Sequence, residues 1–306
     1  MLQQNRSSST TRRRVRVLHK GHRVIMNRYC FDLDSSVRSL RVNGYCIIPE
    51  VLPASFCPGL RDRLSDIAEQ IATVEHRAAG ILTVPGLINY EQSFAAYLAD
   101  DRILAVVEAM LGSHPRISFT TIQQNVPGKK RSAWHADWPF NQNNVGHIPT
   151  PYPDFTMHLT MLLMVSPFTE ANGGTLIVPG SHRTTSNPTD PDLGVDPLAP
   201  YPTEFRVTGK AGSAVLLDSR LWHCAPDNLS MDESRVAIAV RYAPLWLNLD
   251  LLDSDSNYRK QVLEATGKNN QIVPRIPLSI YESLPDKAKP LYRHWIADET
   301  RRFVQK

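Results

Sequence analysis

Cysteine is scarce in this 306-residue sequence, and its four cysteines are not arranged in pairs. Cys30, Cys46, Cys57 and Cys224 form no Cys-x-x-Cys motif, so neither a disulfide framework nor a zinc knuckle is expected. The sequence therefore predicts reduced thiols and a protein of the reducing cytoplasm.

Long apolar runs and an acidic N-terminus are also missing. No stretch approaches the roughly 20 apolar residues of a membrane span. The apolar content of 42% predicts instead a globular chain with a sizeable core.

No acidic residue precedes Asp32, and much of the net charge of +4 comes from arginines in residues 1–28. Without them the chain is near neutral, so nothing predicts a nucleic-acid partner.

Residues 1–28 have the composition of a disordered basic tail. An organelle-targeting segment is the alternative interpretation, and it would change the expected compartment. A hydrophobic signal core is lacking, so secretion is not expected. Residues 29–306 are predicted to form a single domain.

The first part of this domain has a helical pattern. After a short strand at residues 44–49, apolar residues recur at helical spacing from Leu60 to Ile71. A second helix is predicted between Asp100, a candidate N-cap, and Gly112. Residues 50–112 are thus expected to form a helical support, and residues 250–306 a helical C-terminal segment.

Residues of about 115–245 have the pattern of short strands. Strands are predicted at 117–125, 155–165, 175–178, 204–208, 213–218 and 235–242, with Gly-, Pro- and Asn-rich turns between them. This pattern predicts a mainly β fold with flanking helices, of the jelly-roll kind.

The segment Trp134-His135-Ala136-Asp137-Trp138 carries the strongest chemical signal. On an extended strand, His135 and Asp137 point to the same face and can bind one metal ion. His223 is the best candidate for a third ligand. Two histidines and one carboxylate form the facial triad of non-haem iron(II) oxygenases, which leaves three coordination positions open.

The order of several short motifs resembles the phytanoyl-CoA dioxygenase (PhyH) family. These motifs are Trp134-His135-x-Asp137, Asn172-Gly173-Gly174, Pro179-Gly180-Ser181-His182, His223 with Asn228, and Arg235. The resemblance implies a double-stranded β-helix of the cupin-like kind that uses Fe(II), 2-oxoglutarate and O2. It implies oxidation, usually hydroxylation, of an unactivated C–H bond of a small organic substrate, with release of succinate and CO2. Desaturation, cyclisation and epimerisation remain open.

The resemblance also assigns roles to single residues. It implies that His135, Asp137 and His223 hold iron and that Arg235 binds the distal carboxylate of 2-oxoglutarate. A planar guanidinium offers paired donors to a carboxylate, and the small Ala237 and Ala239 share its strand face.

Two further co-substrate contacts are predicted, at Gln124 and Thr160. Gln123, on the opposite face of the strand, is the alternative to Gln124. Arg241 shares the face of Arg235 but lies about 20 Å further along the strand, so it ranks below Arg235.

Substrate contacts are expected from the loop that follows the His-x-Asp motif and from the next strand. The candidates are Trp138, Phe140, Asn141 and His158. His182 is expected to be structural, and Asp218 is expected to order the segment that delivers His223.

Two other functional classes fit the same residues. One is a non-enzymatic jelly-roll binding module, in which His-x-Asp is incidental. The other is a cupin-like metal-dependent hydrolase or isomerase that does not use 2-oxoglutarate, against which Arg235 argues. The expected partner is a small molecule, and the sequence does not indicate an oligomeric state.

Overall fold

The computed structural model describes residues 31–138, 151–267 and 272–297. The chain divides into two compact units, Met1–Phe31 and Asp32–Lys306, and the described helices and strands belong to the second. The predicted basic tail, residues 1–28, lies outside the described residues.

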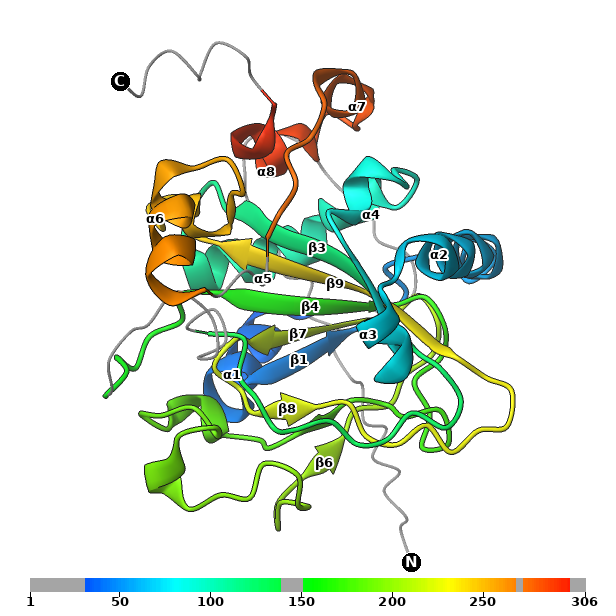
Figure 1. Ribbon diagram of the computed structural model, residues 1–306, viewed down its shortest axis with the longest axis vertical. Coiled ribbons are helices and arrows are strands. Elements are labelled where there is room, and N and C mark those ends of the chain that lie inside the picture. Colours follow the sequence, from blue (N-terminus) through cyan, green and yellow to red (C-terminus); the bar gives the residue numbers. More distant parts are fainter. Residues whose placement is uncertain (1–30, 139–150, 268–271, 298–306) are drawn as a thin grey trace, which may run out of the picture. The chain divides into compact units, whose positions relative to one another are not determined.

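Among the described residues, nine strands form two antiparallel sheets, and Figure 1 shows their arrangement. The large sheet has the order β1-β7-β4-β9-β3-β2, and the small sheet has the order β6-β5-β8. The strands are β1 (Tyr45–Ile48), β2 (Ile81–Pro85), β3 (Arg116–Asn125), β4 (Leu159–Met164), β5 (Leu176–Ile177), β6 (Phe205–Arg206), β7 (Ala214–Asp218), β8 (His223–Cys224) and β9 (Arg235–Ala243).

The core lies between the inner faces of these sheets. Residues that are directly opposite in an antiparallel pair share a face, so the register identifies the inward side chains. Leu162 of β4 lies opposite both Val215 of β7 and Ala239 of β9. All three pack in one buried cluster with Ile177 of the small sheet. This arrangement of strands is the predicted jelly roll.

The helices lie on the outer side of the large sheet and around its ends. They are α1 (Leu33–Asn43), α2 (Cys57–Ile71), α3 (Val74–Ala78), α4 (Ala95–Leu98), α5 (Asp101–Leu111), α6 (Asn257–Thr266), α7 (Leu278–Ser283) and α8 (Lys289–Tyr292). Tyr242 of β9 donates a hydrogen bond to the carbonyl of Leu98 in α4 at 2.8 Å. Thr120 of β3 is hydrogen-bonded to Tyr292 of α8 at 2.8 Å. No helix among the described residues is long and apolar enough to cross a membrane.

The helix predicted between Asp100 and Gly112 is confirmed as α5. The side chain of Asp100 accepts hydrogen bonds from the backbone N–H groups of Arg102 and Ile103, at 2.9 and 3.4 Å. Gly112 ends the helix with a φ of 86°. A side-chain cap at the start and a glycine at the end are the expected boundaries of a short helix.

The sequence did not predict α1 or β2, and it placed the start of β4 too early. β2 lies within residues 50–112, predicted to be helical, and is held by pairing with β3. Tertiary pairing decides so short a strand more than its own propensity does. β4 begins at Leu159 rather than Phe155, because Leu159 is the first residue with partners on both sides, Asp218 and Tyr242.

The turn before β7 supplies a test of the fold. Gly212 has a φ of 89°, and a Cβ there would lie 2.4 Å from the carbonyl oxygen of Leu52. Gly112 has a similar φ of 86° but nothing within 4 Å of its would-be Cβ. Gly112→Ala should therefore cost only the conformational penalty of about 1–3 kcal/mol. Gly212→Ala should cost roughly 1–3 kcal/mol more.

Urea unfolding of the two variants measures this difference. Equal losses of stability would show that the backbone around Leu52 moves freely, and would contradict the tight junction between the β1 and β7 segments.

Candidate metal centre

A backbone pairing brings the two predicted histidine ligands together. His135 and His223 face each other in an antiparallel bridge, with N–H···O distances of 3.0 and 2.9 Å. Asp218 orders the turn before β8, as expected. Its carboxylate accepts hydrogen bonds from the backbone N–H of Arg220 at 3.0 Å and from the guanidinium at 3.1 and 3.0 Å.

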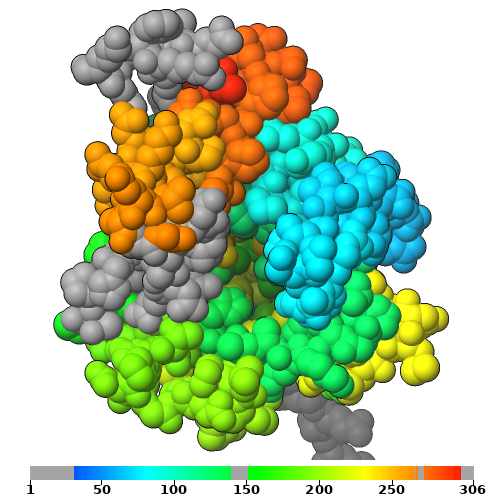
Figure 2. Space-filling model, in the orientation of Figure 1, coloured from blue at the N-terminus to red at the C-terminus, as the bar shows by residue number. Residues whose placement is uncertain are grey.

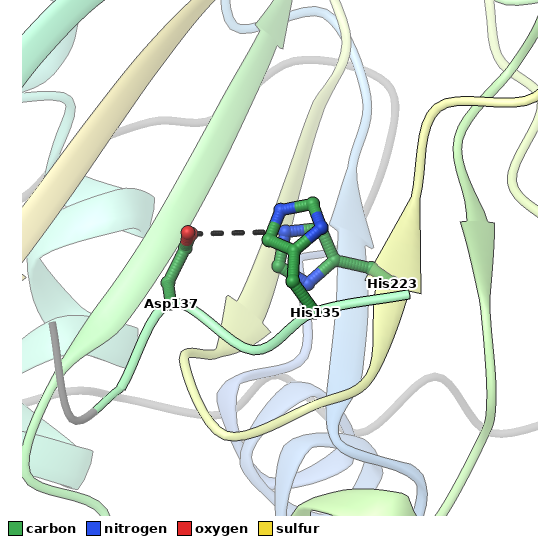
Figure 3. A group of neighbouring side chains, drawn as sticks. All are labelled: His135, Asp137 and His223. Carbon is green, nitrogen blue, oxygen red and sulfur yellow. Dashed lines mark ion pairs between the residues drawn. The ribbon is translucent and has the colours of Figure 1, made fainter. Parts of the chain in front are cut away.

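The side chains of His135, Asp137 and His223 converge on one point (Figure 3). One candidate ligand atom from each residue lies within 4.8 Å of the other two. His223 Nε2 is 3.8 Å from Asp137 Oδ2, and the two imidazole centroids are 4.3 Å apart. The structure thus brings together all three residues that the sequence selected.

Both histidines have one ring nitrogen engaged by the backbone. Nδ1 of His135 lies 3.1 Å from the carbonyl oxygen of Ala133, and Nδ1 of His223 lies 2.8 Å from that of Leu221. A carbonyl oxygen only accepts, so each Nδ1 donates. Each Nε2 of a neutral ring is then left with a lone pair. Burial lowers the pKa of His135 to about 4, which keeps its ring neutral at physiological pH.

Both oxygens of Asp137 are also engaged. Arg241 donates to Oδ1 at 2.6 Å, and the Thr160 hydroxyl donates to Oδ2 at 2.7 Å. Burial alone would raise the pKa of this carboxyl group, but the charge of Arg241 outweighs it, with help from Thr160. The pKa of Asp137 therefore lies well below its usual range, and the group is anionic.

This set of donors fits a divalent transition metal. It offers two neutral imidazole nitrogens and one anionic oxygen from three separate side chains, and three positions around a six-coordinate ion remain for other ligands. The backbone carbonyls that hold each Nδ1 fix the tautomer and orientation of the rings, as is usual for metal-binding histidines.

Arg235 is a buried cation without a carboxylate partner among the described residues. Its side chain is 1% exposed, donates to the Thr175 hydroxyl at 3.2 Å, and stacks 4.6 Å from the centroid of the Phe168 ring. Its Nε has no hydrogen-bond partner. Burial lowers its pKa to about 10, so the guanidinium stays charged at neutral pH. A charge buried in this way fits an anionic ligand.

Two residues that the sequence did not select lie near Arg235. Asn125 is its direct partner across β3 and β9 and is 1% exposed. Neither atom of its side-chain amide has a hydrogen-bond partner among residues 31–138, 151–267 and 272–297. Lys129 is buried, and its Nζ donates to the carbonyl oxygens of Ala225 and Pro226 at 2.7 and 3.4 Å. Burial, and then the charge of Arg235, lower the pKa of Lys129 to about 8. The sequence held one signal for Asn125: side chains alternate along a strand, so Asn125 shares a face with Gln123, which was already a candidate.

The structure changes three of the predicted side-chain roles. Gln124 lies opposite Val236, so it points away from the face of Arg235, whereas the alternative, Gln123, points toward that face. Thr160 is on the inner face, but its hydroxyl hydrogen is used by Asp137 rather than being available to a co-substrate. Arg241, ranked below Arg235 as a carboxylate clamp, binds Asp137.

Of the four predicted substrate contacts, two are buried and two lie outside the described residues. His158 is 1% exposed and bonded between two serines, and Trp138 is buried near it, with ring centroids 5.9 Å apart, so neither presents a free surface. Phe140 and Asn141 lie outside the described residues. His182 is not part of the triad; its Nε2 lies 3.2 Å from the carbonyl oxygen of Arg41.

The molecule is hollowed on the face that Figure 2 shows. The recess opens between the segment of α2 and α3, drawn in blue to cyan, and the segment of α6, drawn in orange. Green and yellow segments, the colours of β3, β4 and β9, lie deeper in the recess.

The jelly roll, the converging triad and the buried arginine define a metal-dependent oxygenase of the facial-triad class. A family model described as phytanoyl-CoA dioxygenase (PhyH) matches residues 40–237, and the chain belongs to this family. The predicted family is thereby confirmed, as is the reaction class: oxidation that depends on Fe(II), 2-oxoglutarate and O2.

Individual relatives are distant. An uncharacterized protein of Mycobacterium tuberculosis is 25% identical over 286 residues, covering 86% of this chain and 95% of that protein. Dioxygenase af480 of Aspergillus fumigatus is 27% identical over 225 residues, covering 69% of this chain and 67% of its own. The crystal structure of EctD from S. alaskensis with 2-oxoglutarate and 5-hydroxyectoine has a TM-score of 0.56 at 20% identity, covering 69% of this chain and 76% of EctD. That likeness shows the shared fold.

The unpaired charge of Arg235 leads to a stability prediction. Arg235→Met keeps much of the bulk but removes a buried charge, so the metal-free variant should be as stable as the wild type or more stable, by up to about 4 kcal/mol. Arg220→Met is the matched control, because the Arg220 guanidinium binds the buried Asp218. Its loss should cost about 3–5 kcal/mol, since it leaves a carboxylate unpaired.

Urea unfolding of both metal-free variants provides the measurement. If Arg235→Met lost as much stability as Arg220→Met, the charge of Arg235 would be compensated inside the protein and no anionic ligand would be needed.

Proposed function

We propose that His135, Asp137 and His223 hold the iron of this oxygenase and that Arg235 holds the distal carboxylate of 2-oxoglutarate. The observation that carries the proposal is the convergence of the three ligand atoms within 4.8 Å in the same sheet sandwich that buries the uncompensated guanidinium. When bound, iron and 2-oxoglutarate supply the oxidation of an unactivated C–H bond by O2, with release of succinate and CO2.

The protein's own residues orient the co-substrate. Arg235 offers paired N–H donors, which match the two oxygens of a carboxylate. Asn125 adds an amide with both atoms unpartnered, and Lys129 adds a second buried positive charge. Ala237 and Ala239 share the inner face with Arg235, where they pack in the buried core cluster.

We infer that the substrate is a small organic molecule that enters through the recess of Figure 2. Hydroxylation is the expected outcome, because Asp137 fills the coordination position that a halide would need.

The three cysteines within the described residues are free thiols, which supports a reducing, cytoplasmic location.

The iron assignment is tested with His223→Ala. Removing one of three protein ligands should lower iron affinity and succinate formation by at least about a hundred-fold, since the loss of a mere outer contact already costs 10–100-fold. His182→Ala is the matched control, because His182 is buried but lies outside the triad. Iron content after anaerobic reconstitution and succinate release are measured for both.

Full iron content and activity in a folded His223→Ala protein would refute the assignment. Stoichiometric metal without succinate formation in the wild type would favour a hydrolase or isomerase, and no metal at all would favour a binding module.

The carboxylate is tested with Asp137→Gly. Asp137 supplies one coordination position and one negative charge, so the wild type should form no chlorinated product in chloride buffer. The glycine variant opens the position but loses the tethered anion. We expect weaker iron binding, sharply reduced hydroxylation and at most trace chlorination. Product masses in chloride and in halide-free buffer give the answer, and undiminished hydroxylation by the variant would show that Asp137 is not a ligand.

A further inference from the structure

A chain of hydrogen bonds between buried side chains ends on Asp137. It runs from Ser118 Oγ to His158 Nε2 (2.6 Å), from His158 Nδ1 to Ser219 Oγ (3.0 Å), from Ser219 Oγ to Thr160 Oγ1 (2.9 Å) and from Thr160 Oγ1 to Asp137 Oδ2 (2.7 Å). No member is more than 3% exposed. Because the chain ends on a carboxylate oxygen, it bears on the position of Asp137.

An irregularity in β3 makes the chain possible. The register between β3 and β9 shifts between Ile117 and Phe119, so Ser118 is an extra residue opposite β9. Such a bulge re-aims one side chain while pairing continues on either side. Here the bulge brings the Ser118 hydroxyl to the His158 ring. In a regular strand, Ser118 would point to the face opposite that of Phe119, away from His158.

The carboxylate fixes the direction of every hydrogen bond in the chain. Asp137 is anionic and only accepts, so Thr160 must donate to it. Thr160 has one hydroxyl hydrogen, so it accepts from Ser219. Ser219, having donated, must accept from Nδ1 of His158. His158 therefore carries its proton on Nδ1.

The other end of the chain is compatible with this assignment, because the single hydrogen of the Ser118 hydroxyl can go either to Nε2 or to the carbonyl oxygen of Arg241 at 3.2 Å. Burial, and then the charge of Arg241, lower the pKa of His158 to about 3, so the ring is neutral. With Nδ1 protonated, Nε2 accepts a hydrogen bond from Ser118. The opposite tautomer would leave no hydrogen between the oxygens of Ser219 and Thr160, which are 2.9 Å apart.

We propose that His158 is a positioning residue of the metal site. As the Nδ1–H tautomer it orients Ser219 and Thr160, so that the Thr160 hydrogen occupies one lone pair of Asp137 Oδ2. Arg241 holds Oδ1 at 2.6 Å. The carboxylate is thereby fixed from both sides, and one remaining lone pair of Oδ2 faces His223. The role of Asp137 as a metal ligand rests on the proposed function.

The tautomer is tested by NMR on metal-free protein with 15N-labelled histidine. Two-bond 1H–15N correlation spectra distinguish Nδ1–H from Nε2–H rings, and His158→Phe identifies the signals by their loss. We expect a single Nδ1–H form in the wild type. In Thr160→Val the Ser219 hydroxyl loses its acceptor at position 160 and can donate to Nδ1 of His158 instead. The Ser118 hydroxyl can then donate to the carbonyl oxygen of Arg241 at 3.2 Å and accept from Nε2–H. The Nε2–H form should then appear.

Thr160→Ser is the matched control, because it keeps the hydroxyl and should keep the wild-type tautomer. Metal affinity is measured on the same proteins by anaerobic competition with a chromophoric chelator, using Fe(II). Thr160→Val and His158→Phe should each bind about 10–100-fold more weakly, as is usual when contacts that orient a ligand are lost. Thr160→Ser should bind like the wild type.

Each outcome decides the proposal. An Nε2–H or charged His158 in the wild type would overturn it, as would Thr160→Val with unchanged tautomer and unchanged affinity. A wild type that shows the Nδ1–H ring but binds no Fe(II) would refute the proposed function and the positioning role, while leaving the direction of the chain established.

Discussion

Two backbone hydrogen bonds exchanged by His135 and His223 join segments that are far apart in the sequence. Opposed residues of an antiparallel pair lie on one side of it, so this single pairing sets both imidazoles beside each other. Their Nδ1 atoms are bound by backbone carbonyls, which leaves both Nε2 atoms as candidate ligand atoms, and Nε2 of His223 lies 3.8 Å from Asp137 Oδ2. The geometry of the candidate centre is thus a consequence of strand pairing, and the side chains need little further ordering to accept a metal.

Asp137 and Arg235, two buried charged groups, differ in how their charges are compensated. The negative charge of Asp137 is balanced by the positive charge of Arg241, and Thr160 orients the carboxylate. Asp137 is therefore stable as an anion in the metal-free protein. Within the part of the chain that the structure describes, Arg235 contacts only the Thr175 hydroxyl and the Phe168 ring, and the Asn125 amide on the same face has no hydrogen-bond partner. An unpaired buried charge destabilises a fold, and the proposed 2-oxoglutarate would supply the opposite charge.

Much of this site could be predicted from sequence, for identifiable reasons. The three candidate ligands follow from two-residue alternation and from the order of short motifs, which do not depend on long-range register. The prediction that Gln124 shares the face of Arg235 was wrong. The face of a β3 residue is set by the pairing of Asn125 with Arg235 and by the bulge at Ser118. Local sequence contains neither.

The roles of Thr160 and Arg241 were missed for a related reason. Thr160 was predicted to contact the co-substrate, but its hydrogen is taken by Asp137, which comes from another segment. Arg241 was judged only by its distance along β9 from Arg235, whereas its partner is Asp137. The hidden strand β2 likewise depends on its pairing with β3.

The most direct test is a crystal structure of the protein grown anaerobically with Fe(II) and 2-oxoglutarate, with anomalous data at the iron edge. We expect one anomalous peak at about 2.0–2.2 Å from Nε2 of His135, Nε2 of His223 and Oδ2 of Asp137, the usual range for such ligands. The distal carboxylate of 2-oxoglutarate should lie against Arg235. An iron peak elsewhere, or 2-oxoglutarate bound away from Arg235, would contradict the account.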